Sequence, residues 1–149
     1  DLEYGRVEVQ LLNDSAPNHV ARIKELARKK FYDNIVFHRV ITGFMAQTGD
    51  PTGTGMGGSD LPDLQAEFNS QPHSRGAVSM ARAQSPNSAN SQFFIVTDDS
   101  SFLDNQYTVW GRVIKGMEFV DKIKKGNGPN GSVDNPDAMI SVRVAADVK

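Results

Sequence analysis

The chain has 149 residues, 38% of them apolar, which is enough for one domain with a real core and too few for two. Its formal net charge of −2 gives no reason to expect nucleic acid or an anionic membrane as a partner, and no apolar run approaches the roughly 18–20 residues of a membrane span. Cysteine is absent, which excludes disulfides, thiolate catalysis and sulfur-based zinc sites. From the length we expect a single domain over residues 1–149.

The first elements along the chain are a strand and a helix. Residues 7–11 alternate apolar and polar side chains, the period-2 pattern of a half-buried strand. Residues 16–31 carry apolar side chains at helical spacing, with Asp14 or Ser15 as the N-cap and Pro17 in the first turn. We expect an amphipathic helix that covers one end of the core.

The rest of the chain carries six more apolar runs with strand character and one with helical spacing. The strands are predicted at residues 35–40, 44–48, 77–81, 92–97, 108–114 and 139–144, and the helix at 116–125. Four glycines and two prolines make residues 50–63 a loop, either ordered or mobile. Many short strands with two distant helices predict a mainly β fold in which one sheet closes on itself and a helix caps each open end. Closure would remove free strand edges, as suits a monomer.

Residues 37–47 combine one cation with several large apolar side chains. On a regular strand Phe37, Arg39 and Ile41 share one face, and Gln47 is a plausible partner for Arg39 across the bend at Gly43. The alternative is an arginine whose stem packs and whose head reaches water at the rim.

A site of this kind grips an apolar group and presents one fixed charge to it. Rotation about the amide that precedes proline needs little more, because its barrier of roughly 18–20 kcal/mol comes from amide resonance. None of the three histidines has metal-binding spacing, the serines lack a nucleophile elbow, and the glycine run at 53–58 lacks a phosphate-binding lysine. We therefore expect neither a metal nor a cofactor.

Four motifs resemble those of the cyclophilin-type peptidyl-prolyl isomerases. They are F-H-R-V-I at 37–41, G-F-M-A-Q-T-G-D at 43–50, S-M-A at 79–81 and S-Q-F-F-I at 91–95. The resemblance extends from about Gly5 to Val144, and the compact loops are more similar to bacterial members. It implies a closed eight-stranded antiparallel barrel capped by two α-helices. The implied activity is cis-trans isomerisation of X-Pro bonds in peptides and folding proteins.

The resemblance also implies the site residues. Arg39 matches the catalytic arginine, and Gln47 the glutamine that steadies it. The walls of the proline pocket match Phe44, Met45, Phe94 and Leu103. A polar substrate contact matches Gln92, and the groove beside the residue preceding proline matches Ala81 and Arg82. Phe102 and Tyr107 match two further substrate-binding positions.

Three positions depart from the common family pattern. Arg82 stands where the family often has asparagine, which should alter the edge of the groove but keep its backbone contacts. Phe102 replaces a frequent tryptophan whose indole N–H binds cyclosporin, so we expect weak cyclosporin binding. Tyr107 replaces the histidine of many eukaryotic members, and either ring can close the pocket. The amino-terminal strand also looks shorter than is usual.

The alternative function is a proline-peptide-binding or chaperone-like module with little turnover, which would share the pocket but not need Arg39. The expected location is the cytoplasm. Because the chain begins with Asp1, the periplasm is the alternative if a leader has been removed.

Overall fold

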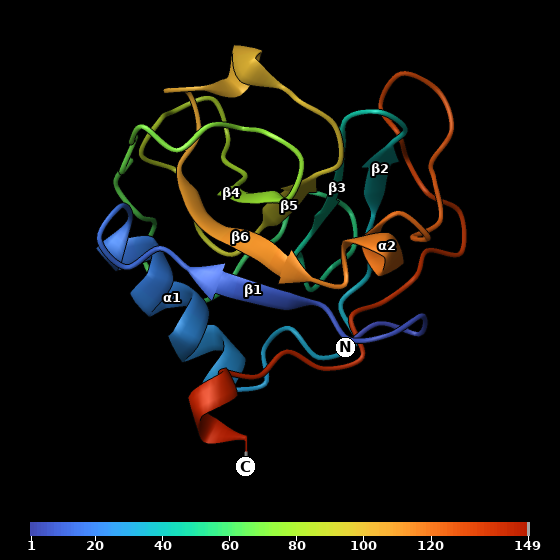
Figure 1. The fold of residues 1–149 in the computed structure, drawn as a ribbon, viewed down its shortest axis with the longest axis horizontal. Coiled ribbons are helices and arrows are strands. Elements are labelled where there is room, and N and C mark those ends of the chain that lie inside the picture. The colour runs from blue at the N-terminus through green and yellow to red at the C-terminus, as the bar shows by residue number, and fades with distance from the viewer. Residues whose placement is uncertain (149) are drawn as a thin grey trace.

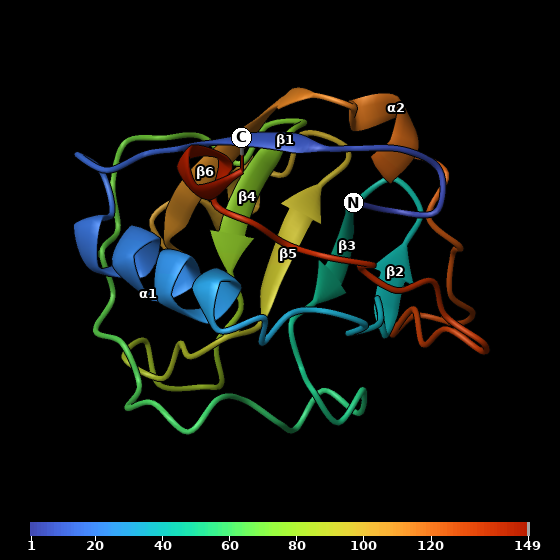
Figure 2. The ribbon, with the colours of Figure 1, turned by 90° about the horizontal axis from the view of Figure 1, so that it is seen from below.

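One antiparallel sheet organises the computed structural model, which describes residues 1–148 (Figures 1 and 2). Its strands follow the order β1-β6-β4-β5-β3-β2. The strands are β1 (Glu8–Leu11), β2 (Arg39–Ile41), β3 (Met45–Thr48), β4 (Ala77–Met80), β5 (Phe93–Val96) and β6 (Val109–Lys115). The helices are α1 (Pro17–Arg28) and α2 (Met117–Val120), with 3₁₀ turns η1 (Ser101–Leu103) and η2 (Ala145–Asp147).

The two faces of the sheet pack into two separate apolar clusters. The main core includes Val40, Ile95 and Phe93 from the sheet together with residues of α1, which lies across this face (Figure 2). A smaller outer cluster on the other face includes Phe94 and Val109. Phe93 and Phe94 therefore point to opposite faces, as adjacent residues of a strand do.

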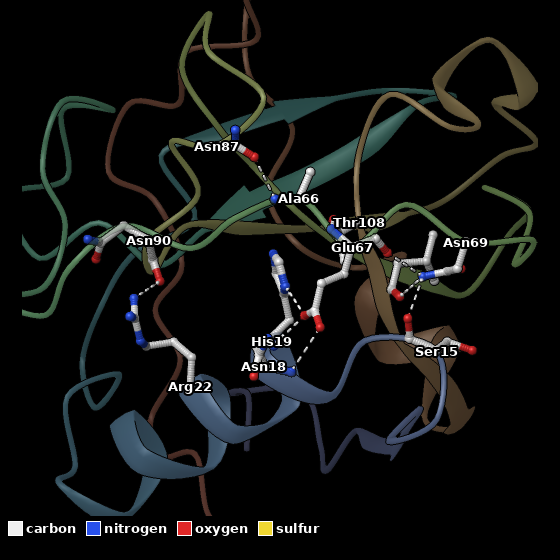
Figure 3. Close-up of polar contacts among 11 residues, drawn as sticks. Ser15, Asn18, His19, Arg22, Ala66, Glu67, Asn69, Asn87, Asn90 and Thr108 are labelled. Carbon is white, nitrogen blue, oxygen red and sulfur yellow. Dashed lines mark hydrogen bonds and ion pairs between the residues drawn. The ribbon is translucent and has the colours of Figure 1, made fainter.

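The amino-terminal end of α1 is capped from a distant part of the chain. The predicted cap by Asp14 or Ser15 is wrong, because no side chain adjacent in sequence caps this end. Instead, the Glu67 carboxylate accepts hydrogen bonds from the backbone N–H groups of Asn18 (3.1 Å) and His19 (2.8 Å) (Figure 3). A carboxylate at this end also complements the helix dipole.

The prediction of a closed eight-stranded barrel is wrong. The sheet has six strands and is open, and residues 139–144 contain no strand. Met139 instead accepts a hydrogen bond from the Asn34 N–H and donates one to the Ile35 carbonyl, outside any ladder. The second helix is also shorter than the predicted 116–125.

The segment next to β2 explains why the sheet does not close. Residues 126–138 contain three glycines and two prolines. They contact the β2 side through single bridges, from Ser132 to Arg39 and from Ala138 to Val36. Proline cannot donate to a ladder and glycine weakens a strand, so this segment covers the edge without forming regular pairing. No helix within residues 1–148 is long and apolar enough to cross a membrane.

Candidate active site

Cross-strand pairing places Arg39 in the same row of residues as Phe94, which belongs to the outer cluster. Arg39 on β2 lies opposite Gln47 on β3, Gln47 lies opposite Phe94 on β5, and Phe94 lies opposite Ser79 on β4. Residues directly opposite one another in a sheet point to the same face. The guanidinium and Phe94 therefore share the outer face of the sheet.

Phe37 does not share that face, contrary to the prediction. It is 2% exposed and packs in the main core together with Val40. The regular strand begins only at Arg39, so the alternation of β2 does not extend back to Phe37. Ile41 does follow the pattern and packs against the outer cluster.

Arg39 is half-buried and held by two acceptors. Its Nε donates to the Asn130 carbonyl at 2.9 Å, and its Nη1 donates to the Gln47 side-chain oxygen at 3.1 Å. The predicted Gln47 contact is thus confirmed. In the described part of the chain, no carboxylate lies within 4 Å of this guanidinium. Its charge is oriented but not neutralised.

The Gln47 side chain is itself oriented by a second glutamine. The Gln47 Nε2 donates to the Gln92 Oε1 at 2.9 Å, and the Gln92 Nε2 donates to the carbonyls of Gly55 (3.0 Å) and Gly57 (2.9 Å). Carbonyls can only accept, so the Gln92 amide nitrogen must face them and its oxygen must face Gln47. This chain of donors leaves the Gln47 oxygen directed at Arg39.

The loop that supplies those carbonyls is ordered by one buried carboxylate. Asp50 is 1% exposed and accepts hydrogen bonds from the backbone N–H groups of Thr52 (2.8 Å), Thr54 (3.1 Å) and Gly55 (2.6 Å). Burial by itself would raise the Asp50 pKa, but the hydrogen bonds from Thr52 and the loop backbone outweigh it and lower the pKa to about 2. The loop is therefore anchored at neutral pH.

The remaining predicted site residues gather around the outer cluster. Met45, Phe94 and Leu103 are buried in it, and Phe44, Ala81 and Tyr107 pack against it. The Phe102 ring is 68% exposed and lies 5.6 Å from the Phe44 ring. The Arg82 guanidinium lies 4.8 Å from the centre of the Tyr107 ring. The structure thus brings every predicted position to one face.

A hollow of about 350 Å³ opens beside Arg39. It is lined by Arg39, His38 and Gln47 together with residues of the loops at 53–55 and 130–133. Arg39 and Gln47 therefore line this hollow and also share a face of the sheet with Phe94.

A buried histidine, His73, packs against Phe94. The His73 ring stacks on the Phe94 ring at 6.1 Å. One ring nitrogen contacts Asp104 at 2.9 Å, and the other contacts the Ser79 hydroxyl at 2.8 Å. Burial lowers the His73 pKa more than Asp104 raises it. Although these are the residues of a hydrolase triad, Ser79 is 0% exposed, so it cannot attack a substrate.

Comparison with known proteins decides the family. A family model described as cyclophilin type peptidyl-prolyl cis-trans isomerase/CLD matches residues 1–145. The chain belongs to the cyclophilin-type peptidyl-prolyl isomerase family. A probable peptidyl-prolyl cis-trans isomerase of Brucella suis is 53% identical over 160 aligned positions, covering 99% of this cyclophilin and 82% of the relative. Peptidyl-prolyl cis-trans isomerase-like 1 of Aspergillus fumigatus is 39% identical and covers 90% and 86%.

Solved cyclophilins have the same fold. The crystal structure of AquaCyp293 from Hirschia baltica superposes with a TM-score of 0.88 at 30% identity, over 99% of this cyclophilin and 73% of that chain. A cyclophilin-type isomerase from Cryptosporidium parvum, crystallised in the presence of the dipeptide Ala-Pro, also gives 0.88, at 28% identity over 95% and 94%. The cyclophilin fold is therefore confirmed even though the sheet of this member is open.

Sequence reasoning missed several residues that support this cyclophilin site. Asn130 contributes only a backbone carbonyl, which any residue type could supply, so its identity carried no signal. Asp50 was visible as the last residue before a glycine-rich loop, a common place for a carboxylate that binds backbone N–H groups. His73 is a structural histidine, and its stacking on Phe94 could not be read from spacing.

Proposed function

We propose that this cyclophilin catalyses cis-trans isomerisation of X-Pro bonds, with the proline ring bound against the outer cluster. The pocket walls are Phe44, Met45, Phe94 and Leu103, which form one apolar surface beside Arg39. An apolar wall suits the pyrrolidine ring and excludes water from it. The family, its named relatives and the Cryptosporidium structure prepared with Ala-Pro support this reading.

The observation that carries the proposal is the fixed, unneutralised guanidinium of Arg39 on the same face as Phe94. As the amide twists, resonance is lost and the prolyl nitrogen regains a lone pair. A guanidinium N–H can donate to that lone pair, or can hold the proline carbonyl in the orientation that permits this. Donation to nitrogen is stronger in the twisted amide than in the planar one, which is the condition for catalysis.

The test compares Arg39→Ala with Phe94→Ala. Removal of one preorganised donor typically costs 10²-fold or more, so Arg39→Ala should lower kcat at least about 30-fold and retain much of the peptide affinity. Phe94→Ala should mainly weaken binding. Rates are measured by NMR exchange spectroscopy on an acetyl-Ala-Ala-Pro-Phe-amide peptide, which needs no coupling protease.

The same pair of variants separates an isomerase from a binding module with little turnover. A binding module would lose affinity with Phe94→Ala and be insensitive to Arg39→Ala. Arg39→Lys keeps the charge but cannot hold both the Asn130 carbonyl and Gln47 in the same geometry, so it should recover only part of the rate. An unchanged rate in Arg39→Ala, with the fold intact by circular dichroism, would eliminate the proposed role.

We further propose that the protein binds cyclosporin weakly and works as a monomer. Phe102 occupies the exposed wall beside Phe44 and has no N–H to donate. Residues 126–138 cover the β2 edge, which leaves this edge less open to a strand of a second copy.

A further inference from the structure

Arg82 follows shortly after β4, and β5 and β3 separate β4 from β2, the strand of Arg39. The Arg82 side chain joins two loops. Its Nε donates to the Gln106 carbonyl at 2.9 Å, and its Nη1 donates to the carbonyls of Ala83 (3.1 Å) and Gln84 (3.0 Å). Its guanidinium also lies over the Tyr107 ring. These contacts fix the position of a cation at the groove wall, since a planar fork held at three points has little freedom.

One nitrogen of the Arg82 guanidinium, Nη2, is available to bind a ligand. Among residues 1–148, no acceptor binds the Arg82 Nη2, and no carboxylate lies within 4 Å of the guanidinium. Four other arginines of the described chain are paired with carboxylates; these are Arg6, Arg28, Arg75 and Arg143. The guanidinium groups of Arg39 and Arg82, by contrast, have no carboxylate partner among the described residues.

The backbone of Arg82 is also free. Its neighbours Met80 and Ala81 donate to the carbonyls of Thr108 and Gln92, but within the described residues the N–H and C=O of Arg82 have no partner. An unpaired backbone N–H and C=O on one residue can pair with an antiparallel peptide. A peptide residue paired there would place its side chain on the same side as that of Arg82.

We propose that Arg82 makes this cyclophilin select peptides with an acidic side chain at one of the two positions that precede proline. The inference rests on the proposed function, because it needs proline seated beside Phe94. The adjoining Ala81 packs against the outer cluster, so a peptide on the Arg82 backbone continues directly into the proline pocket. The Nη2 group then binds a Glu or Asp carboxylate, while Arg39 acts on the proline itself.

The test measures kcat/KM by NMR exchange spectroscopy for acetyl-Ala-X-Pro-Phe-amide and acetyl-X-Ala-Pro-Phe-amide, with X as Glu, Gln or Lys. In one of the two series Glu should exceed Gln about two- to five-fold, the range of an exposed ion pair, and Lys should fall below Gln. The Glu-to-Gln ratio should approach one at about 1 M salt, where the Debye length is about 3 Å.

The variants assign the preference to Arg82. Arg82→Gln should bring the Glu-to-Gln ratio to one, and Arg82→Lys should retain a ratio above one. Because the ratio is taken within each variant, general loosening of the loops cancels. Arg28→Gln, which removes the same charge from the exposed surface of α1, should keep the wild-type ratio.

Failure of this inference can be told from failure of the proposed function. A ratio of one in the wild-type protein in both series, or a ratio that survives Arg82→Gln, overturns the role of Arg82 and leaves isomerisation intact. Absence of catalysis on all peptides would instead reject the proposed function.

Discussion

The chain of side-chain amides from Gln92 to Gln47 to Arg39 makes a prediction about coupled mutations. If Gln92 acts only by orienting Gln47, its removal should matter while Gln47 is present and matter little once Gln47 is gone. If Gln92 instead contacts the substrate, as its sequence position suggests, the two effects should be independent. A double-mutant cycle of Gln47→Ala and Gln92→Ala separates these cases.

The hydrogen bonds of the structure set the expected sizes. Gln47→Ala removes a hydrogen-bond acceptor from the charged Arg39, and such a bond contributes about 1.5–3 kcal/mol. If about 1.4 kcal/mol of this is lost from the stabilisation of the transition state, kcat falls about ten-fold. Gln92→Ala removes the neutral bond that fixes the Gln47 amide, about 1 kcal/mol, so kcat should fall about five-fold. The double variant should lose about ten-fold, not the roughly fifty-fold of independent effects.

The assay is NMR exchange spectroscopy on one X-Pro peptide, with melting temperatures to show that each variant folds. The coupling energy should be about 1 kcal/mol and should appear in kcat. A loss of about fifty-fold in the double variant, or an effect of Gln92→Ala confined to KM, would refute the orienting role. Gln65→Ala, at an exposed position, is the control for loss of a glutamine amide and should match the wild-type protein.

Two further predictions concern stability. Glu67→Ala removes the acceptor for two helix N–H groups and the His19 ring, so it should lower the free energy of unfolding by about 2–4 kcal/mol, or roughly 6–12 °C in Tm. As a control, Glu25→Ala at an exposed position of the same helix should change stability by less than about 0.5 kcal/mol. Equal losses for the two variants in urea titrations would disprove the capping role. Burial lowers the pKa of His19 and of His73 in the folded protein, so between about pH 6.5 and 5 the unfolded chain binds more protons and stability should fall as pH falls. The slope should reach at most about 1.4 kcal/mol per pH unit for each histidine, and a flat or opposite trend in urea unfolding would contradict it.

Much of the site could be predicted because its parts are local in sequence. The bend at Gly43 folds residues 39–48 into a two-stranded unit in which Arg39 lies opposite Gln47, a pairing set by residues close in sequence. Strand alternation likewise forces Phe93 and Phe94 to opposite faces. The family motifs fall in these same segments, which is why sequence and structure agree there.

Apart from the face of Phe37 and the length of the second helix, the errors concern partners that are distant along the chain. Nothing near α1 indicates that Glu67, about 50 residues away, caps it. The apolar run at 139–144 has strand character, yet its neighbours are loop segments and it forms no ladder. Whether such a run pairs depends on the path of the chain at the sheet edge, which residues 126–138 decide by covering β2 irregularly.

The sequence alone indicated the family through its motifs, and it determined the faces of the central strands and the pairing of Arg39 with Gln47 through short-range periodicity and the turn at Gly43. The tertiary structure decided that the sheet stays open and that Gln92 faces the loop carbonyls. It also decided that the Arg82 Nη2 has no acceptor among the described residues. These features depend on which distant donors and acceptors the folded chain brings within hydrogen-bonding distance, and on which of them it leaves without a partner.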